Sequence, residues 1–218
     1  MTDLQFAIAA AEPVMYAAVP QVAFKLHITD AAAAPLPIET IVLRAQIRIE
    51  PTKRRYEPSS HVGLRDLFGG PERWGQTQRS MLWTHASVIV PAFQKETDVD
   101  LPVPCSFDFN VAATKYFQAL ETGDIPLGFL FSGSVFYRAA EGTLQVAQIP
   151  WEREASFRLP VATWREMMDH YYPNTAWLCI HREVLQRLTE YKAQHSIPTW
   201  DQALRQLLAT EAAEEMLP

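Results

Sequence analysis

Basic and aromatic side chains concentrate in one segment of this acidic chain, and they are its best candidates for molecular recognition. Residues 44–79 hold eight of the nineteen Lys and Arg residues against four acids, although the whole chain carries a net charge of -6. Arginine and large aromatic residues are enriched at the hot spots of protein interfaces. The pattern predicts a surface that binds a partner protein, formed by Arg44, Arg48, Arg54, Arg55, Tyr56, Phe68, Arg73 and Trp74.

The same residues also have a purely structural interpretation. The arginines could cover the exposed face of a sheet, while Phe68 and Trp74 pack a long loop onto the core. Basic residues beside aromatic residues also suit single-stranded nucleic acid, because bases stack on aromatic rings. The acidic balance opposes that use, since proteins that bind phosphate backbones usually carry a basic excess. A protein partner is therefore expected, nucleic acid is not, and self-association stays open.

Sequence motifs for catalysis are absent. The chain has no Gly-rich phosphate loop, no G-x-S-x-G elbow and no H-E-x-x-H pair, and its six histidines are scattered. We therefore predict no catalytic residue, no cofactor and no metal ligand. The alternative is an enzyme with a dispersed site, for instance His61, Asp66 and His85, which would require a deep polar pocket around them.

The clearest element is a strand in strict alternation, with Ile41, Leu43, Ala45, Ile47 and Ile49 on one face and Arg44, Gln46 and Arg48 on the other. Earlier alternating runs over residues 4–8 and 22–28 predict two more antiparallel strands, and three such strands in succession suggest a meander or one layer of a sandwich. An irregular passage then covers residues 63–75. Further strands are expected over residues 86–90, 97–109, 125–138, 144–149 and 155–159, with 125–138 central.

The final third changes to helical patterns. A short helix is expected over residues 111–120, capped by Asn110, before the sequence reaches two S/T-x-x-E/Q capping boxes that begin at Thr163 and Thr199. These boxes predict helices from Trp164 and Trp200, and a third helix covers residues 182–195. Strands followed by helices indicate an α+β fold: a mainly antiparallel, β-sandwich-like body over 1–160 and three C-terminal helices in 161–218, packed on the body as a single domain.

Composition sets the remaining expectations. The chain has 218 residues, 48% of them hydrophobic, which is enough for a substantial core. No leader pattern and no apolar run of the roughly 20 residues that span a membrane is present, so a cytoplasmic protein that does not bind membranes is expected. Cys105 and Cys179 lack metal-like spacing, and we interpret both as small buried hydrophobic residues.

Short motifs spread over nearly the whole chain resemble an uncharacterised bacterial family, a domain of unknown function of about this length. The motifs are Arg54-Arg55-Tyr56, Leu67-Phe68-Gly69, Trp74, Leu82-Trp83, Lys115-Tyr116-Phe117, Pro126-Leu127, Phe131-Ser132-Gly133, Ile149-Pro150-Trp151, Tyr172-Pro173-Asn174 and Pro198-Thr199-Trp200-Asp201. Members of this family are often encoded near genes for nickel-iron uptake hydrogenases and their maturation factors. The resemblance implies an accessory role, with a hydrogenase subunit or a maturation factor as the partner, and it supplies no catalytic residues.

A second similarity is to export chaperones of the SecB type, which are acidic oligomers that bind unfolded chains in apolar grooves. The shared features are the acidic balance and the order of strands before helices. The sequence thus leaves three functions open: an adaptor for one partner, a chaperone for many clients, or an enzyme with a dispersed site.

Overall fold

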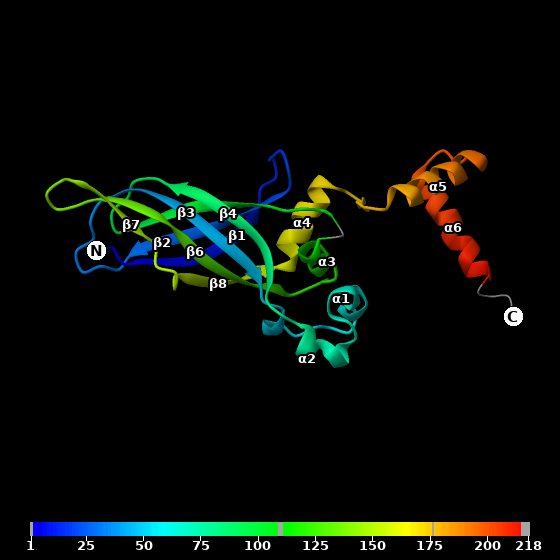
Figure 1. The fold of residues 1–218 in the computed structure, drawn as a ribbon, viewed down its shortest axis with the longest axis horizontal. Coiled ribbons are helices and arrows are strands. Elements are labelled where there is room, and N and C mark those ends of the chain that lie inside the picture. The colour runs from blue at the N-terminus through cyan, green and yellow to red at the C-terminus, as the bar shows by residue number, and fades with distance from the viewer. Residues whose placement is uncertain (1, 109–110, 176, 215–218) are drawn as a thin grey trace. The chain divides into compact units, whose positions relative to one another are not determined.

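The chain forms an α+β structure in a computed structural model, which describes residues 2–108, 111–175 and 177–214. It divides into two compact units, Met1–Trp177 and Leu178–Pro218. The first unit contains eight antiparallel strands in two sheets, and three of the helices lie in the C-terminal part of the chain (Figure 1). The predicted fold class is confirmed. The predicted packing of residues 161–218 on the body as a single domain stays a prediction.

The first sheet contains three strands in the order β1-β2-β5: β1 Leu4–Pro13, β2 Gln21–Asp30 and β5 Glu96–Pro104. The second sheet has the order β4-β3-β6-β7, with β8 also paired to β6: β3 Ile38–Ile49, β4 Met81–Val90, β6 Asp124–Arg138, β7 Leu144–Gln148 and β8 Glu154–Pro160. The prediction that the first three strands share one layer is wrong, because β3 joins the second sheet. The loop over residues 31–37 carries the chain from one sheet to the other.

The two sheets pack face to face through aromatic side chains. The ring of Phe24 on β2 meets Phe129 on β6 at a centroid distance of 5.1 Å, and Phe6 on β1 stacks on Phe131 at 4.5 Å. The alternation of β3 places Ile41, Leu43, Ala45, Ile47 and Ile49 on this interior side, where each is fully buried. The polar residues of β3 therefore face away from the first sheet, as the alternation predicts.

Helices close one end of the sandwich. They are α1 Ser60–Phe68, α2 Trp74–Thr77, α3 Ala112–Gln118 and α4 Val161–Tyr171, with 3-10 turns at Pro51–Lys53 and Pro71–Arg73. The prediction of an irregular passage over 63–75 is wrong, because most of it is helical: Leu64 and Phe68, one turn apart on α1, are both buried. The proposed cap Asn110 lies outside the described residues.

Helix α4 begins three residues before the predicted start. Val161 follows β8 directly, and its N–H donates to the carbonyl of Gly123, so the chain enters the helix from the sheet without the expected capping box at Thr163. Trp164 is buried and packs on Phe117 of α3 at 5.5 Å. The Tyr171 hydroxyl donates to the carbonyl of Val14 at 2.7 Å.

The second unit contains α5 Arg182–Gln194 and α6 Trp200–Glu214, which contact each other. The predicted cap of α6 is confirmed, because the Gln202 N–H donates to Thr199 Oγ1 at 3.2 Å. Cys105 is buried as expected, but Cys179 is exposed, so that part of the prediction is wrong. Within the described residues, no helix has both the length and the apolar character needed to cross a membrane.

Candidate partner-binding site

The structure separates the eight predicted binding residues into three places. Arg44 and Arg48 lie on the outer face of the second sheet, where their neighbours in register are Ser87 and Leu82 of β4. Arg54 and Arg55 follow the end of β3. The remaining four, Tyr56, Phe68, Arg73 and Trp74, belong to the helical end of the body.

Tyr56, Phe68 and Trp74 form an aromatic cluster that fixes the helical end to the core. Trp74 meets Tyr56 edge-on at a centroid distance of 5.2 Å, His61 at 4.8 Å and Phe68 at 6.3 Å. Its indole N–H donates to the carbonyl of Gly69 at 3.0 Å. Phe68 is only 3% exposed. Its side chain is therefore part of the core at this end of the molecule, and almost none of its surface is accessible to a partner.

The hydroxyl of Tyr56 links this cluster to the fully buried Tyr116. The two hydroxyl oxygens lie 2.8 Å apart, and Tyr56 also donates to the carbonyl of Pro51 at 2.8 Å. Burial disfavours a phenolate here and raises the pKa of both tyrosines. Both rings are therefore neutral hydrogen-bonding groups at physiological pH, and neither is poised to act as a base.

The neighbours Arg54 and Arg55 have different environments. Arg54 donates through Nη2 to the carbonyl of Thr122 at 2.5 Å and through Nη1 to the carbonyl of Asp124, so it ties the end of β3 to the start of β6. Arg55 is exposed, as is Arg73. Within the described part of the chain, the side chains of Arg55 and Arg73 make no ion pair or hydrogen bond. Arg54 is thus a structural residue, whereas Arg55 is available to a ligand.

A hollow of about 820 Å³ lies on the outer face of the second sheet beside Arg44. Its side chains come from β3, β4, β6 and the connection between β7 and β8: Arg44, Gln46, His85, Ser87, Leu130, Ser132 and Trp151. Trp151 is 83% exposed. A highly exposed tryptophan next to an exposed arginine has the composition of an interface hot spot.

Trp151 lies in an interruption of the sheet edge. β7 and β8 pair with β6 one after the other, and between them three residues of β6, 131–133, face five residues, 149–153. The N–H of Phe131 donates to the carbonyl of Arg153 at 2.9 Å, and that of Ile149 donates to the carbonyl of Gly133 at 2.9 Å. These two hydrogen bonds fix the backbone at both ends of the connection over residues 149–153.

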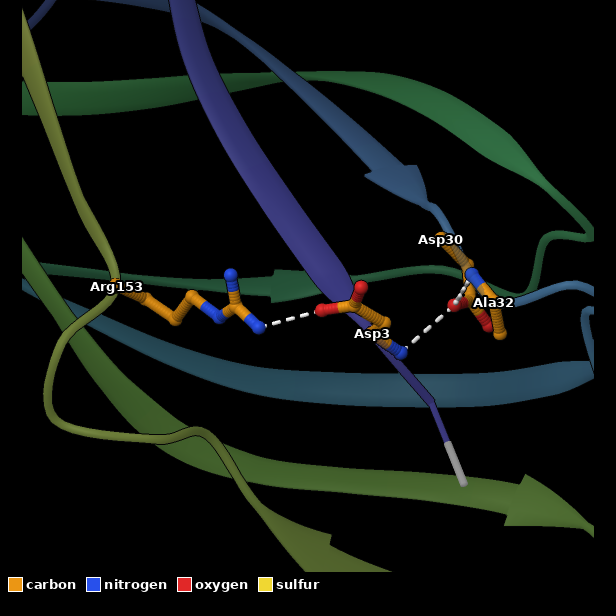
Figure 2. A network of polar contacts seen from close by, with 4 residues as sticks. All are labelled: Asp3, Asp30, Ala32 and Arg153. Carbon is orange, nitrogen blue, oxygen red and sulfur yellow. Dashed lines mark hydrogen bonds and ion pairs between the residues drawn. The ribbon is translucent and has the colours of Figure 1, made fainter.

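A polar network anchors the same connection to the first sheet (Figure 2). Arg153 Nη2 lies 2.5 Å from Asp3 Oδ1, at the start of β1. The backbone N–H of Asp3 donates to the carboxylate of Asp30 at 2.8 Å, and that carboxylate also accepts the N–H of Ala32 at 3.1 Å. Asp30 is only 3% exposed. The network therefore ties the connection to the first sheet through Arg153, two residues after Trp151.

Sequence reasoning did not select Trp151 as a candidate binding residue. The available signal was an aromatic residue after proline between two predicted strands, but the sequence does not indicate that this connection lies beside Arg44. It also left Gln46, His85 and Ser132 out of the site. They occupy outward positions of three neighbouring strands, where Gln46 is in register with His85 on one side and with Leu130 on the other.

The residues of the dispersed enzyme hypothesis are divided between two places. His85 lines the hollow beside Arg44, whereas His61 packs against Trp74 and Asp66 pairs with Lys115 at 3.4 Å. Neither His61 nor Asp66 lines that hollow. In the described ranges, no group of three His, Cys, Asp or Glu residues could hold a metal ion.

These features define an α+β protein with a two-sheet body, whose second sheet carries an exposed basic and aromatic surface. The chain belongs to a family of unknown function, DUF6084, whose model matches residues 1–216. This confirms the predicted membership of an uncharacterised family. No curated protein matches the chain.

Proposed function

We propose that this protein is a non-enzymatic accessory protein that binds a partner protein through the outer face of its second sheet. The observation that carries the proposal is the hollow that Arg44 and the highly exposed Trp151 line together. The predicted residues Arg44 and Arg48 belong to this surface, and Trp151 supplies the central aromatic anchor. Arg55 and Arg73 remain predicted contacts, although they lie away from this hollow.

Apolar side chains on the same sheet face support a protein as the partner. Val42 on β3 and its register neighbour Ile89 on β4 are both exposed, Ile89 to 72%. Leu82, which pairs with Arg48, is exposed as well. Apolar residues beside an arginine and an exposed tryptophan match the core of a protein interface, where aromatic and arginine side chains supply most of the affinity.

Charge favours an acidic surface on the partner. In the described residues, Arg44 and Arg48 make no ion pair, and they lie on a chain whose net charge is -6. A partner with a local acidic patch would meet attraction at this face and repulsion over most of the remaining surface, which steers encounter towards the site. The resemblance to a family encoded near nickel-iron uptake hydrogenases supports hydrogenase maturation or assembly as the setting.

The test is affinity purification of the full chain from its native host, followed by mass spectrometry. Trp151→Ala and Arg44→Glu are the binding variants, and Tyr16→Ala and Arg65→Glu are their controls, because Tyr16 and Arg65 are an exposed aromatic residue and an exposed arginine elsewhere on the first unit. Loss of a hot-spot side chain costs about 2 kcal/mol or more, which is about thirtyfold in affinity.

The expected result is one retained partner that is lost with both binding variants and kept with both controls. Equal capture by Trp151→Ala and the parent chain would contradict the proposed surface. Capture of many unrelated unfolded chains, with suppression of their aggregation, would instead support the SecB-like function. Turnover of a small molecule that depends on His85 would support an enzyme.

A further inference from the structure

A second hollow, of about 530 Å³, lies where β3 ends and β8 passes the start of β6. It shares no lining residue with the hollow beside Trp151. Four cationic side chains line it against two carboxylates, and two threonines contribute further polar groups: Lys53, Arg54, Arg55, Arg158, Glu57, Asp124, Thr52 and Thr122. In a protein with a net negative charge, this segregation of positive charge into one concave site requires an explanation.

Two of the four cations are held in place by the backbone. Arg54 is fixed by the carbonyls of Thr122 and Asp124, and its guanidinium lies against Gly123. Arg158 donates through Nη2 to the carbonyl of Lys53 at 3.2 Å. A guanidinium has five N–H donors, so this single bond leaves Arg158 further donors for a ligand. Cations that are already ordered lose less conformational entropy when an anion binds.

The other two cations have no partner inside the described structure. Neither the ammonium of Lys53 nor the guanidinium of Arg55 makes an ion pair or a side-chain hydrogen bond with a described residue. Glu57 and Asp124 lower the positive potential of the hollow without pairing with either cation among the described residues. The site therefore combines two ordered arginines with two further basic groups that remain available.

We infer that this hollow binds a small molecule that carries a diphosphate or triphosphate group. The volume lies within the range of small-molecule sites, about 300 to 1,000 Å³. Arginine forks match the oxygens of phosphate, and a lysine adds a point charge. Because the cations are partly exposed to water, each pair contributes little by itself. Several adjacent negative charges on one ligand are needed to engage Lys53, Arg55 and Arg158 together.

Calorimetric titration of the full chain with pyrophosphate tests this inference, with orthophosphate and citrate as comparison anions. The variant Lys53→Ala/Arg55→Ala removes the two cations without removing an intramolecular bond made by either side chain. Its matched control is Arg65→Ala/Arg79→Ala, which removes the same charge from exposed arginines outside the hollow. Arg158→Lys keeps the charge but removes the fork, and circular dichroism checks the fold of each variant.

Pyrophosphate is expected to bind more tightly than orthophosphate or citrate at matched ionic strength. The Lys53→Ala/Arg55→Ala variant should weaken it by at least about tenfold, whereas the control should stay within about twofold. The inference is overturned if pyrophosphate does not bind, if citrate binds equally well, or if both double variants weaken binding to the same extent. Trp151→Ala should leave pyrophosphate binding intact, so failure here is distinguishable from failure of the proposed partner surface.

Discussion

Replacement of Arg54 by alanine should destabilise the first unit, whereas the same change at Arg55 should not. The two arginines are adjacent in sequence and carry the same charge, but Arg54 donates to two backbone carbonyls and Arg55 makes no side-chain bond with the described residues. A hydrogen bond that involves a charged group contributes about 1.5 to 3 kcal/mol. Two such bonds would contribute about 3 kcal/mol at the lower end, and because Arg54 is partly exposed, solvent screening reduces the expected total loss to about 2 to 3 kcal/mol.

The contact of Arg54 with Tyr56 adds a smaller amount. The guanidinium carbon lies 5.8 Å from the centre of the Tyr56 ring, at the outer limit of a cation–π contact. For a chain of this length, each 1 kcal/mol shifts Tm by about 2 to 4 °C, so Arg54→Ala should lower Tm by about 4 to 12 °C. Arg55→Ala should change stability by no more than about 0.5 kcal/mol.

Urea unfolding followed by tryptophan fluorescence measures this difference, because buried Trp164 reports on the core of the first unit. Arg54→Lys should fall between the parent chain and Arg54→Ala, since one ammonium keeps the charge but cannot bond both carbonyls in the same geometry. Equal stability of Arg54→Ala and Arg55→Ala would refute the structural role of Arg54. That result would return Arg54 to the group of residues available to a partner.

Two further predictions concern the sheet and the buried tyrosines. Gly133→Ala should cost more than about 3 kcal/mol of unfolding free energy, because its φ is +140° and a Cβ would lie 2.0 Å from the carbonyl oxygen of Val42. Gly142→Ala, at φ +86° with open space, should cost only about 1 to 2 kcal/mol in the same urea experiment, and equal losses would contradict the steric argument. Because burial raises the pKa of Tyr56 and Tyr116 above their unfolded value of about 10, their contribution to stability should be complete below that pH and decline above it. Urea titrations between about pH 8 and pH 11 should show this decline in the parent chain and a smaller one in a double Tyr→Phe variant, and an identical decline in both would contradict it.

The sequence predicts those elements that depend only on a pattern of residues within one short segment. The alternation of β3 predicts its buried and exposed faces because a strand repeats every two residues, and the Thr199 cap of α6 needs only a four-residue motif. Helix α1 was missed because Gly63 and the Gly69-Gly70-Pro71 turn obscure the pair Leu64 and Phe68. These glycines and the proline are typical of loops, so the segment was predicted to be irregular although the spacing of Leu64 and Phe68 is helical.

Features that depend on contacts between distant segments could not be predicted from the sequence. Arg158 reaches the carbonyl of Lys53 only because β8 pairs with β6 beside the end of β3. The adjacent residues Arg54 and Arg55 have the same local sequence signal, and only the carbonyls of Thr122 and Asp124 distinguish their roles. The structure places Tyr56, Phe68 and Trp74 of the predicted site in an aromatic cluster, and the sequence could not indicate that Trp151 lies beside Arg44.

The interruption between β7 and β8 has two physical consequences. An uninterrupted edge strand presents free backbone groups to other chains, and extra residues at an edge prevent such pairing. This protective role requires only the additional length of residues 149–153 and places no demand on the side chain at position 151. A tryptophan that is 83% exposed instead adds apolar surface that favours aggregation. Edge protection therefore explains the interruption but not the exposed tryptophan, which the proposed partner would explain by burying the indole.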